Sequence, residues 1–153
     1  MSGDLFTLDT NILICSVDRK ANHRHELAKQ ISRGSRAKPC LLTLQAISEF
    51  YVAVTRKGIV PPPRARQVAN DLLDLFRTAP VSADAVRSAL QAAASGRAAY
   101  WDALLVATAA EAGCTTILTE DLADGSVLQG VRILNPFAGS VLNPEATALL
   151  AED

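Results

Sequence analysis

Aromatic residues are scarce in this chain of 153 residues, and so are features of a membrane protein or a secreted protein. Phe, Trp and Tyr make up 5% of the sequence while apolar residues reach 49%, so the core must consist chiefly of Leu, Val, Ile and Ala. The most apolar stretch, residues 98–112, contains Asp102 and is shorter than the ~20 residues of a membrane-spanning helix. The N-terminus is acidic and its apolar run is too short for a signal peptide. We therefore expect one domain core in a cytoplasmic protein that makes no contact with a membrane.

Paired cysteines and nucleotide-binding motifs are also missing. Cys15, Cys40 and Cys114 are odd in number, widely spaced and form no C-x-x-C pair, which favours buried structural thiols over a redox or metal role. No G-x-G-x-x-G motif and no P-loop occurs. His23 and His25 lie two positions apart and cannot face the same way on a helix, so a surface or RNA-facing role is favoured over a zinc pair.

The charge is nearly balanced overall but unevenly distributed along the chain. The formal net charge is −1, yet residues 19–66 hold eleven Lys or Arg against two acids, and the other residues hold four against fourteen. A basic segment of this kind can attract a polyanion while acids elsewhere hold a metal ion. Solvated faces of ordinary surface helices would give the same pattern, and the sequence leaves both interpretations open.

Short apolar runs alternate with amphipathic segments along the chain. The pattern predicts a parallel β-sheet with helices covering both of its faces, and hence an α/β fold. Thr43 and Ser82 are expected to cap helices, and Gly58 and Gly113 are expected to end them. The predicted strands span residues 5–8, 39–44, 115–119 and 131–134, with a short one ending at Val81; the predicted helices span residues 12–17, 23–33, 45–57, 64–76, 82–94 and 98–112, with a terminal helix opening at Asn143.

Two acids follow predicted strands directly. Asp9 comes after residues 5–8 and Asp121 after residues 115–119. Ligands of parallel sheets bind beyond the carboxyl ends of the strands, so these two carboxylates are candidates for one crevice. Taken alone, Asp9 is better explained as a helix cap and Asp121 as a cap or turn residue. Asp124 precedes Gly125 and has the pattern of a turn former.

Two further acids lie in predicted helices. The helix over residues 98–112 is apolar all round, including Trp101, which predicts that it is buried. Asp102 near its start would then be a buried carboxylate that needs a cation, unless the helix dipole or an ion pair accounts for it. Glu49 points away from the apolar stripe of its helix, and the pattern alone predicts a surface glutamate.

Four segments together resemble one known family. L-D-T-N-I-L at residues 8–13, S-E-F at 48–50, Y-W-D-A-L-L-V-A-T-A at 100–109 and L-T-E-D-L at 118–122 are similar, in order and spacing, to the four acidic positions of PIN-domain ribonucleases. The order and total length resemble the VapC-type toxins of bacterial toxin–antitoxin pairs. The likeness covers roughly residues 5–137, so residues 1–137 are expected to form the PIN domain and residues 138–153 a C-terminal tail or interface helix.

The resemblance implies a PIN-like α/β/α sandwich with a central parallel sheet. It also implies that Asp9, Glu49, Asp102 and Asp121 meet in one pocket, and that Glu49 is presented there despite its place on the helical wheel. Oxygen ligands select Mg²⁺ or Mn²⁺ rather than zinc. Asp9, Asp102 and Asp121 would hold one metal, and Glu49 would hold a second metal or orient the attacking water. The secondary candidates are Asn11, Thr119 and Asp124; Asp124 is the second choice after Asp121.

The expected activity is a Mg²⁺-dependent endoribonuclease that leaves 5′-phosphate and 3′-hydroxyl ends. The resemblance implies a homodimer and a cognate antitoxin protein, and the basic residues between Arg19 and Arg66 would follow the RNA backbone. One alternative is a haloacid-dehalogenase-like phosphatase, which also has an Asp after its first strand. That family requires D-x-D, whereas this chain has Asn11 at the second position. The other alternative is a non-catalytic RNA-binding domain that has kept the fold.

Overall fold

Strands and helices alternate in the computed structural model, which describes residues 4–151. The central strands follow the predicted positions closely, because each is a short run of buried apolar residues. The larger elements in chain order are β1 (Phe6–Leu8), α1 (Thr10–Cys15), η1 (Arg19–Ala21), α2 (His23–Ser35), β2 (Cys40–Thr43), α3 (Leu44–Arg56), α4 (Pro62–Leu75), β3 (Arg77–Ala79), α5 (Ala83–Ala94), α6 (Tyr100–Glu111), β4 (Thr116–Leu118), β6 (Val131–Leu134) and α7 (Pro144–Leu150).

The main sheet has six strands in the order β3-β2-β1-β4-β6-β5, where β5 is Val127–Leu128. All neighbouring strands pair in parallel except β5, which pairs with β6 in the antiparallel sense. The first strand therefore lies in the middle of the sheet, between β2 and β4. This confirms the predicted α/β fold with a central parallel sheet, and it brings the carboxyl ends of β1 and β4 side by side.

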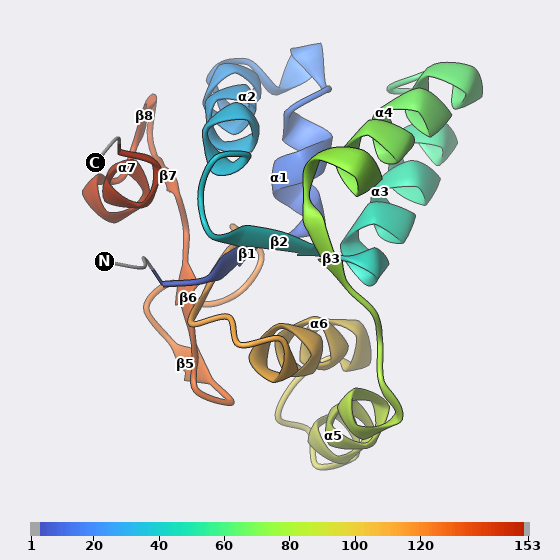
Figure 1. The fold of residues 1–153 in the computed structure, drawn as a ribbon, viewed down its shortest axis with the longest axis vertical. Coiled ribbons are helices and arrows are strands. Elements are labelled where there is room, and N and C mark those ends of the chain that lie inside the picture. The colour runs from blue at the N-terminus through green and yellow to red at the C-terminus, as the bar shows by residue number, and fades with distance from the viewer. Residues whose placement is uncertain (1–3, 152–153) are drawn as a thin grey trace.

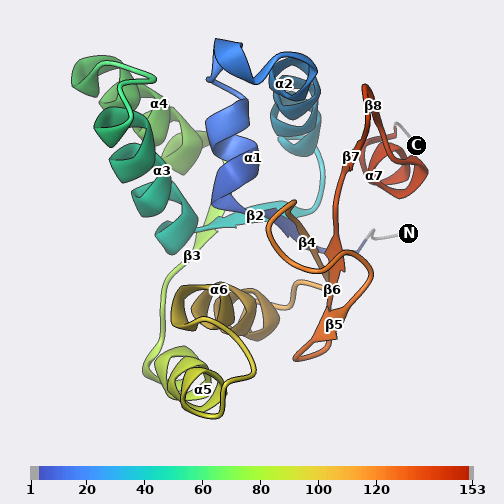
Figure 2. The same ribbon diagram turned by 180° about the vertical axis from the view of Figure 1, so that it is seen from behind.

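Helices cover both faces of the sheet. In Figures 1 and 2, α1, α2, α3 and α4 lie on one side of it, while α5 and α6 lie on the other. The larger core joins Phe6 and Leu8 of β1 to the first group of helices, through residues such as Ile12, Ile31 and Phe50. The smaller core packs Leu105, Val106 and Ala109 of α6 against Ile117 and Ile133. Burying both faces explains why β1, β2 and β4 are buried at every position rather than at alternate ones.

The predicted helix ends are largely confirmed. Thr43 caps α3 through its side chain and Ser82 caps α5, as their hydroxyls accept from backbone N–H groups three residues ahead. Gly58 and Gly113 both have positive φ, the backbone conformation that ends a helix and that glycine adopts without strain. The prediction that a short strand ends at Val81 is wrong, since β3 ends at Ala79. Pro80 has no N–H group to continue the pairing.

The sequence did not predict the short strands near the C-terminus. These are β5 and a separate hairpin of β7 (Phe137–Ala138) and β8 (Val141–Leu142). Beyond them, Asn143 caps α7 through a hydrogen bond to the N–H of Ala146, as expected from the sequence. The α7 side chain of Leu150 lies against Gly34 of α2. The part of the expected tail within residues 138–151 thus packs on its own domain, whereas residues 1–3 and 152–153 lie outside the described part. No helix in the described range 4–151 is long and apolar enough to cross a membrane.

Candidate active site

Asp9 lies where the central strand ends and α1 begins. Its Oδ1 accepts a hydrogen bond of 2.7 Å from the N–H of Thr10, so the predicted capping role is confirmed. Its Oδ2 accepts a 2.8 Å bond from the hydroxyl of Thr119, the residue after β4. Asp9 is only 7% exposed. The carboxylate is therefore fixed between two neighbouring strand ends, which a simple helix cap would not require.

Asn11 connects Asp9 to Asp121 across the same edge of the sheet. Its Nδ2 lies 3.3 Å from Oδ2 of Asp9, 3.1 Å from the Thr119 hydroxyl and 2.9 Å from Oδ2 of Asp121. The Thr119 hydroxyl in turn accepts from the N–H of Asp121 at 3.1 Å. One amide group thus lies between two carboxylates that are more than a hundred positions apart in the sequence.

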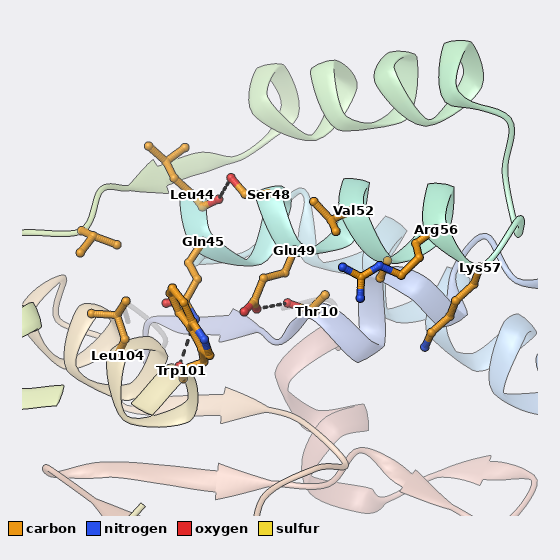
Figure 3. Close-up of a pocket in the computed structure, with 12 residues that line it drawn as sticks. Thr10, Leu44, Gln45, Ser48, Glu49, Val52, Arg56, Lys57, Trp101 and Leu104 are labelled. Carbon is orange, nitrogen blue, oxygen red and sulfur yellow. Dashed lines mark hydrogen bonds between the residues drawn. The ribbon is translucent and has the colours of Figure 1, made fainter. Parts of the chain in front are cut away.

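Glu49 joins this group through Thr10. The hydroxyl of Thr10 donates to Oε2 of Glu49 at 3.1 Å, and Figure 3 shows the two side chains pointing toward each other. Glu49 is half-buried, so the surface glutamate predicted from the helical wheel is wrong. The wheel failed because α1 packs against the face of α3 that carries Glu49. We call the hydrogen-bonded set the carboxylate network; its members are Asp9, Thr10, Asn11, Glu49, Thr119 and Asp121.

Asp102 lies in the first turn of α6 and is half-buried rather than fully buried. No group within residues 4–151 donates a hydrogen bond to its carboxylate. Burial raises the pKa of Asp102, and the negative charge of Asp121 raises it further. The sequence left open whether an ion pair accounts for Asp102; within residues 4–151 the carboxylate forms none, and its burial is less than the sequence predicted. The neighbouring Trp101 is 61% exposed, which also corrects the expectation that the whole helix is buried.

The charges of three acids act on one another. Burial raises the pKa of Asp9 from its ordinary value of 3.8 to about 6, against the hydrogen bonds from Thr119 and Thr10 that lower it. The charges of Asp121 and Asp102 raise this pKa further. Partly buried carboxylates whose pKa is raised by burial and by nearby negative charge, as for Asp9 and Asp102, are stabilised by a cation among them. The donor set is entirely oxygen, which fits Mg²⁺ or Mn²⁺.

Two other acids near the end of β4 have partners of their own. Oδ1 of Asp124 accepts a 2.9 Å hydrogen bond from the N–H of Asn135. Glu120 forms an ion pair of 3.0 Å with Arg24. Asp124 lies in the predicted turn, which is closed by the hydrogen bond from the N–H of Ser126 to the carbonyl oxygen of Ala123. Asp121 is the acid of this loop that faces Asp9 through Asn11.

The acids of the site are held apart from one another. Within residues 4–151, no three His, Cys, Asp or Glu groups lie close enough together to form a ready ligand cluster. The amide of Asn11 accounts for part of this spacing, because it occupies the position between Asp9 and Asp121.

The three cysteine thiols are held in their uncharged form. Burial raises the pKa of Cys15 and that of Cys40, and it raises the pKa of Cys114 to about 11.

A mostly apolar pocket of about 760 Å³ adjoins the carboxylate network. It runs between α3 and α6, and Thr10 and Glu49 belong both to it and to the network (Figure 3). Gln45 donates to the carbonyl oxygen of Trp101 at 3.0 Å and so ties the two helices together at this point. The sequence analysis gave neither Thr10 nor Gln45 a role in the site. The D-T-N spacing was the available signal for Thr10; nothing in the pattern distinguished Gln45.

Comparisons with known proteins place this geometry in a family. The family model described as PIN domain matches residues 6–123. Comparison of the sequence with curated proteins gives no match. Among solved structures, the fold is similar to that of Mycobacterium tuberculosis VapC20, described as a sarcin–ricin loop cleaving toxin, with 18% identity over 76% of this chain and 91% of that one and a TM-score of 0.61.

Two complexes give similar values. A toxin–antitoxin complex from Klebsiella pneumoniae has 22% identity over 86% of this chain and 97% of the matched chain, with a TM-score of 0.60. DNA-bound VapBC from Salmonella typhimurium has 18% identity with the same coverage, 86% and 97%, and a TM-score of 0.60. At these identities the structural likeness concerns the fold, and the family rests on the model that matches most of the sequence. The chain belongs to the PIN domain family.

Proposed function

We propose that this protein is a divalent-metal-dependent endoribonuclease and the toxin of a toxin–antitoxin pair. The observation that carries the proposal is the carboxylate network. It links Asp9, Asp121 and Glu49, which come from three separate elements, while the charge of Asp102 acts on the same group. Acids that served only to stabilise the fold would not need to gather at one place and repel each other. Each of them could form an ion pair with one of the chain's many cations.

In this proposal Asp9, Asp102 and Asp121 hold a Mg²⁺ or Mn²⁺ ion, directly or through water. Glu49 orients the attacking water or holds a second ion. When bound, the metal lowers the pKa of a water molecule and neutralises charge on the phosphate that is attacked. The unpartnered carboxylate of Asp102 and the raised pKa of Asp9 support this assignment, because both groups gain a favourable partner when a cation is bound.

The chain's own residues prepare the site. Thr119 and the N–H of Thr10 each donate to a different oxygen of Asp9, so the carboxylate keeps one orientation. Thr10 holds Glu49 toward the pocket between α3 and α6. Asn11 keeps Asp9 and Asp121 at a fixed separation. Attack by water at the phosphorus would leave a 5′-phosphate and a 3′-hydroxyl.

The toxin assignment draws on the solved structures of similar fold. Several of them are toxin–antitoxin complexes, and one is described as cleaving the sarcin–ricin loop. We accordingly propose an RNA substrate, a cognate antitoxin protein, a homodimer and a cytoplasmic location for this chain. A single-stranded region or loop is the favoured target, because side chains cannot read the deep groove of an RNA duplex.

The proposal is tested by incubating purified protein with RNA in Mg²⁺, in Mn²⁺ and in EDTA. Cleavage should occur with either metal and stop in EDTA. Asp9→Asn and Asp102→Asn should each reduce cleavage at least about 100-fold, with far-UV circular dichroism unchanged. Asp74→Asn, which alters an exposed acid on α4, is the matched control and should cleave normally. Full activity in both site variants would refute the assignment.

The two alternatives make different predictions. The phosphatase alternative loses its basis because the chain belongs to the PIN family and has Asn11 where that enzyme class needs an acid. A non-catalytic RNA-binding domain would bind RNA equally well in wild-type and Asp9→Asn protein, and it would show no uptake of Mn²⁺. Titration of the wild type with Mn²⁺, followed by its electron paramagnetic resonance signal, separates the two.

A further inference from the structure

A second concave region lies next to the apolar pocket and has the opposite character. It is a cleft of about 1030 Å³ bordered by η1, α2, α4 and the turn after α3. Seven Lys or Arg residues line it against two acids, Asp18 and Asp71. We call this region the basic cleft; the cations used in the argument are Arg19, Lys20, Arg33, Arg36, Lys57 and Arg64.

These cations are available to a ligand. All six are exposed. Of the seven cations in the lining, Lys29 is the only one that pairs with a carboxylate in the described part of the chain, at 3.7 Å from Glu26. Like charges that converge from three elements on one concave surface repel each other, and a polyanion relieves that repulsion. The fold therefore concentrates the charge of the basic segment instead of dispersing it over the surface.

The basic cleft borders the pocket beside the carboxylate network at Lys57. Lys57 lines both of them, and Arg56 lines the pocket just before it. Glu49 and Arg56 are seven residues apart on α3, which is about 10 Å along the helix axis and returns to the same face. In Figure 3, Glu49, Arg56 and Lys57 extend from the same side of α3. A strand that enters at the acids can thus pass along α3 into the cleft.

We propose that the basic cleft binds the phosphate backbone of the RNA strand that extends away from the carboxylate network. This inference rests on the proposed nuclease function, because it assigns the strand to that site's substrate. No Phe, Tyr or Trp is among the described residues that line the cleft, and its imidazole, that of His25, is half-buried with Nδ1 2.9 Å from the carbonyl oxygen of Cys15. The cleft therefore has no exposed aromatic platform for bases and recognises the backbone rather than the sequence. An acidic protein segment is the competing occupant. The border with the pocket beside the acids at Lys57 favours RNA.

The experiment measures binding in the Asp9→Asn background, which prevents cleavage. Fluorescence anisotropy gives Kd in Mg²⁺ for a labelled single-stranded RNA of about 6 nucleotides and one of about 20, lengths that bracket the usual single-strand sites. The long RNA should bind at least about tenfold more tightly. Adding Arg33→Glu and Arg36→Glu should weaken binding of the long RNA at least about tenfold and leave the Kd of the short RNA unchanged. For the long RNA, the slope of log K against log[KCl] should become smaller by roughly 1 to 2.

Two arginines on α4 provide a matched pair. Arg64 lines the cleft, whereas Arg66 is equally exposed, lies two residues away and does not line it. Arg64→Glu should weaken binding of the long RNA several-fold, and Arg66→Glu should weaken it less than about twofold. If both changes weakened RNA binding equally, the binding would depend on general surface charge and not on the cleft, and the proposal would be overturned. A poly-glutamate peptide that binds more tightly than the long RNA, with RNA binding insensitive to all cleft variants, would assign the surface to a protein partner instead.

Cleavage assays separate this inference from the function on which it rests. Protein that cleaves with Mg²⁺, but whose KM for long RNA is unchanged by Arg33→Glu and Arg36→Glu, would overturn the cleft and leave the nuclease intact. Protein that cleaves nothing, yet loses the length-dependent binding in the double variant, would overturn the nuclease and leave the cleft as a polyanion site. The changed side chains are exposed, so circular dichroism and Tm should stay at the wild-type values.

Discussion

The carboxylate network and the basic cleft are adjacent, but they are built in opposite ways. Asp9 and Asp121 follow the ends of β1 and β4, Glu49 lies in the middle of α3, and hydrogen bonds fix each of these three acids to its neighbours. The cations of the cleft are exposed side chains on helices and turns, and few have partners. The fold thus determines the position of each acid, whereas the cleft depends only on the sum of its charges. A single substitution in the network should therefore abolish most RNA cleavage, and each substitution in the cleft should weaken RNA binding by a small step.

The largest expected effect separates the two acids of the loop after β4. Asp121→Asn should reduce RNA cleavage about 1000-fold, because it removes a negative ligand from the proposed metal site. Asp124→Asn should leave cleavage within a few-fold of wild type, since its carboxylate instead accepts the N–H of Asn135. Initial rates with saturating Mg²⁺ and one RNA check both. The opposite order of effects would transfer the site role to Asp124.

The next effect concerns stability without metal. The pKa of Asp9 is raised from 3.8 to about 6, so the folded protein holds this proton more tightly than the unfolded chain does. The free energy of unfolding should thus fall as the pH rises from about 4 to about 6, by up to about 3 kcal/mol. Asp9→Asn carries no such charge and should be more stable than wild type at pH 7, with the difference vanishing near pH 4.

Urea unfolding in EDTA at several pH values measures this difference. Mg²⁺ should then raise the stability of the wild type and leave Asp9→Asn unchanged, because a bound ion stabilises only the protein that holds it. Parallel pH profiles for the two proteins would contradict a strained, negatively charged site. Asp74→Asn again serves as the control and should follow the wild type at every pH.

Salt should distinguish the two regions within a single assay. Raising KCl from roughly 50 to 200 mM should increase KM for a long RNA about tenfold, because each phosphate contact in the cleft releases counterions. The value of kcat should change little, since the network is partly buried and its members are joined by short hydrogen bonds. A fall of kcat with an unchanged KM would mean that the salt-sensitive contacts lie at the acids and not in the cleft.

The smallest expected effect tests how Glu49 is held. Thr10→Val removes the hydroxyl that donates to Glu49 and keeps the backbone N–H that donates to Asp9. Cleavage should drop a few-fold, with a loss of stability of at most about 1 kcal/mol. Thr10→Ser keeps the hydroxyl and should retain most of the activity. A loss in Thr10→Ser together with full activity in Thr10→Val would mean that the methyl group of Thr10, and not its hydrogen bond, matters here.

The sequence predicted the central elements because local signals and tertiary packing agree there. Leu5 to Leu8 is apolar and is followed by capping residues, and the same holds at Thr43 and Ser82. Two-residue strands such as β5 and the β7–β8 hairpin escaped prediction, since a pair of residues has no period to detect.

The site was partly predictable for the same reason. Asp9 and Asp121 follow apolar strands, and parallel strand ends share one edge of a sheet. Glu49 could not be predicted from its helix alone, because its position depends on α1 packing against α3. The exposed Trp101 escaped as well: its helix is apolar on every side, so the pattern contains no sign of which side remains open.

The place of β1 in the sheet has a consequence for synthesis of the chain. This strand is made first, yet it pairs with β2 on one side and with β4 on the other. Asn11 meets Asp121 only after 110 further positions have been added. While the ribosome is still translating the message, the emerging polypeptide lacks half of the acidic edge. A fragment released by premature termination before β4 cannot assemble it at all.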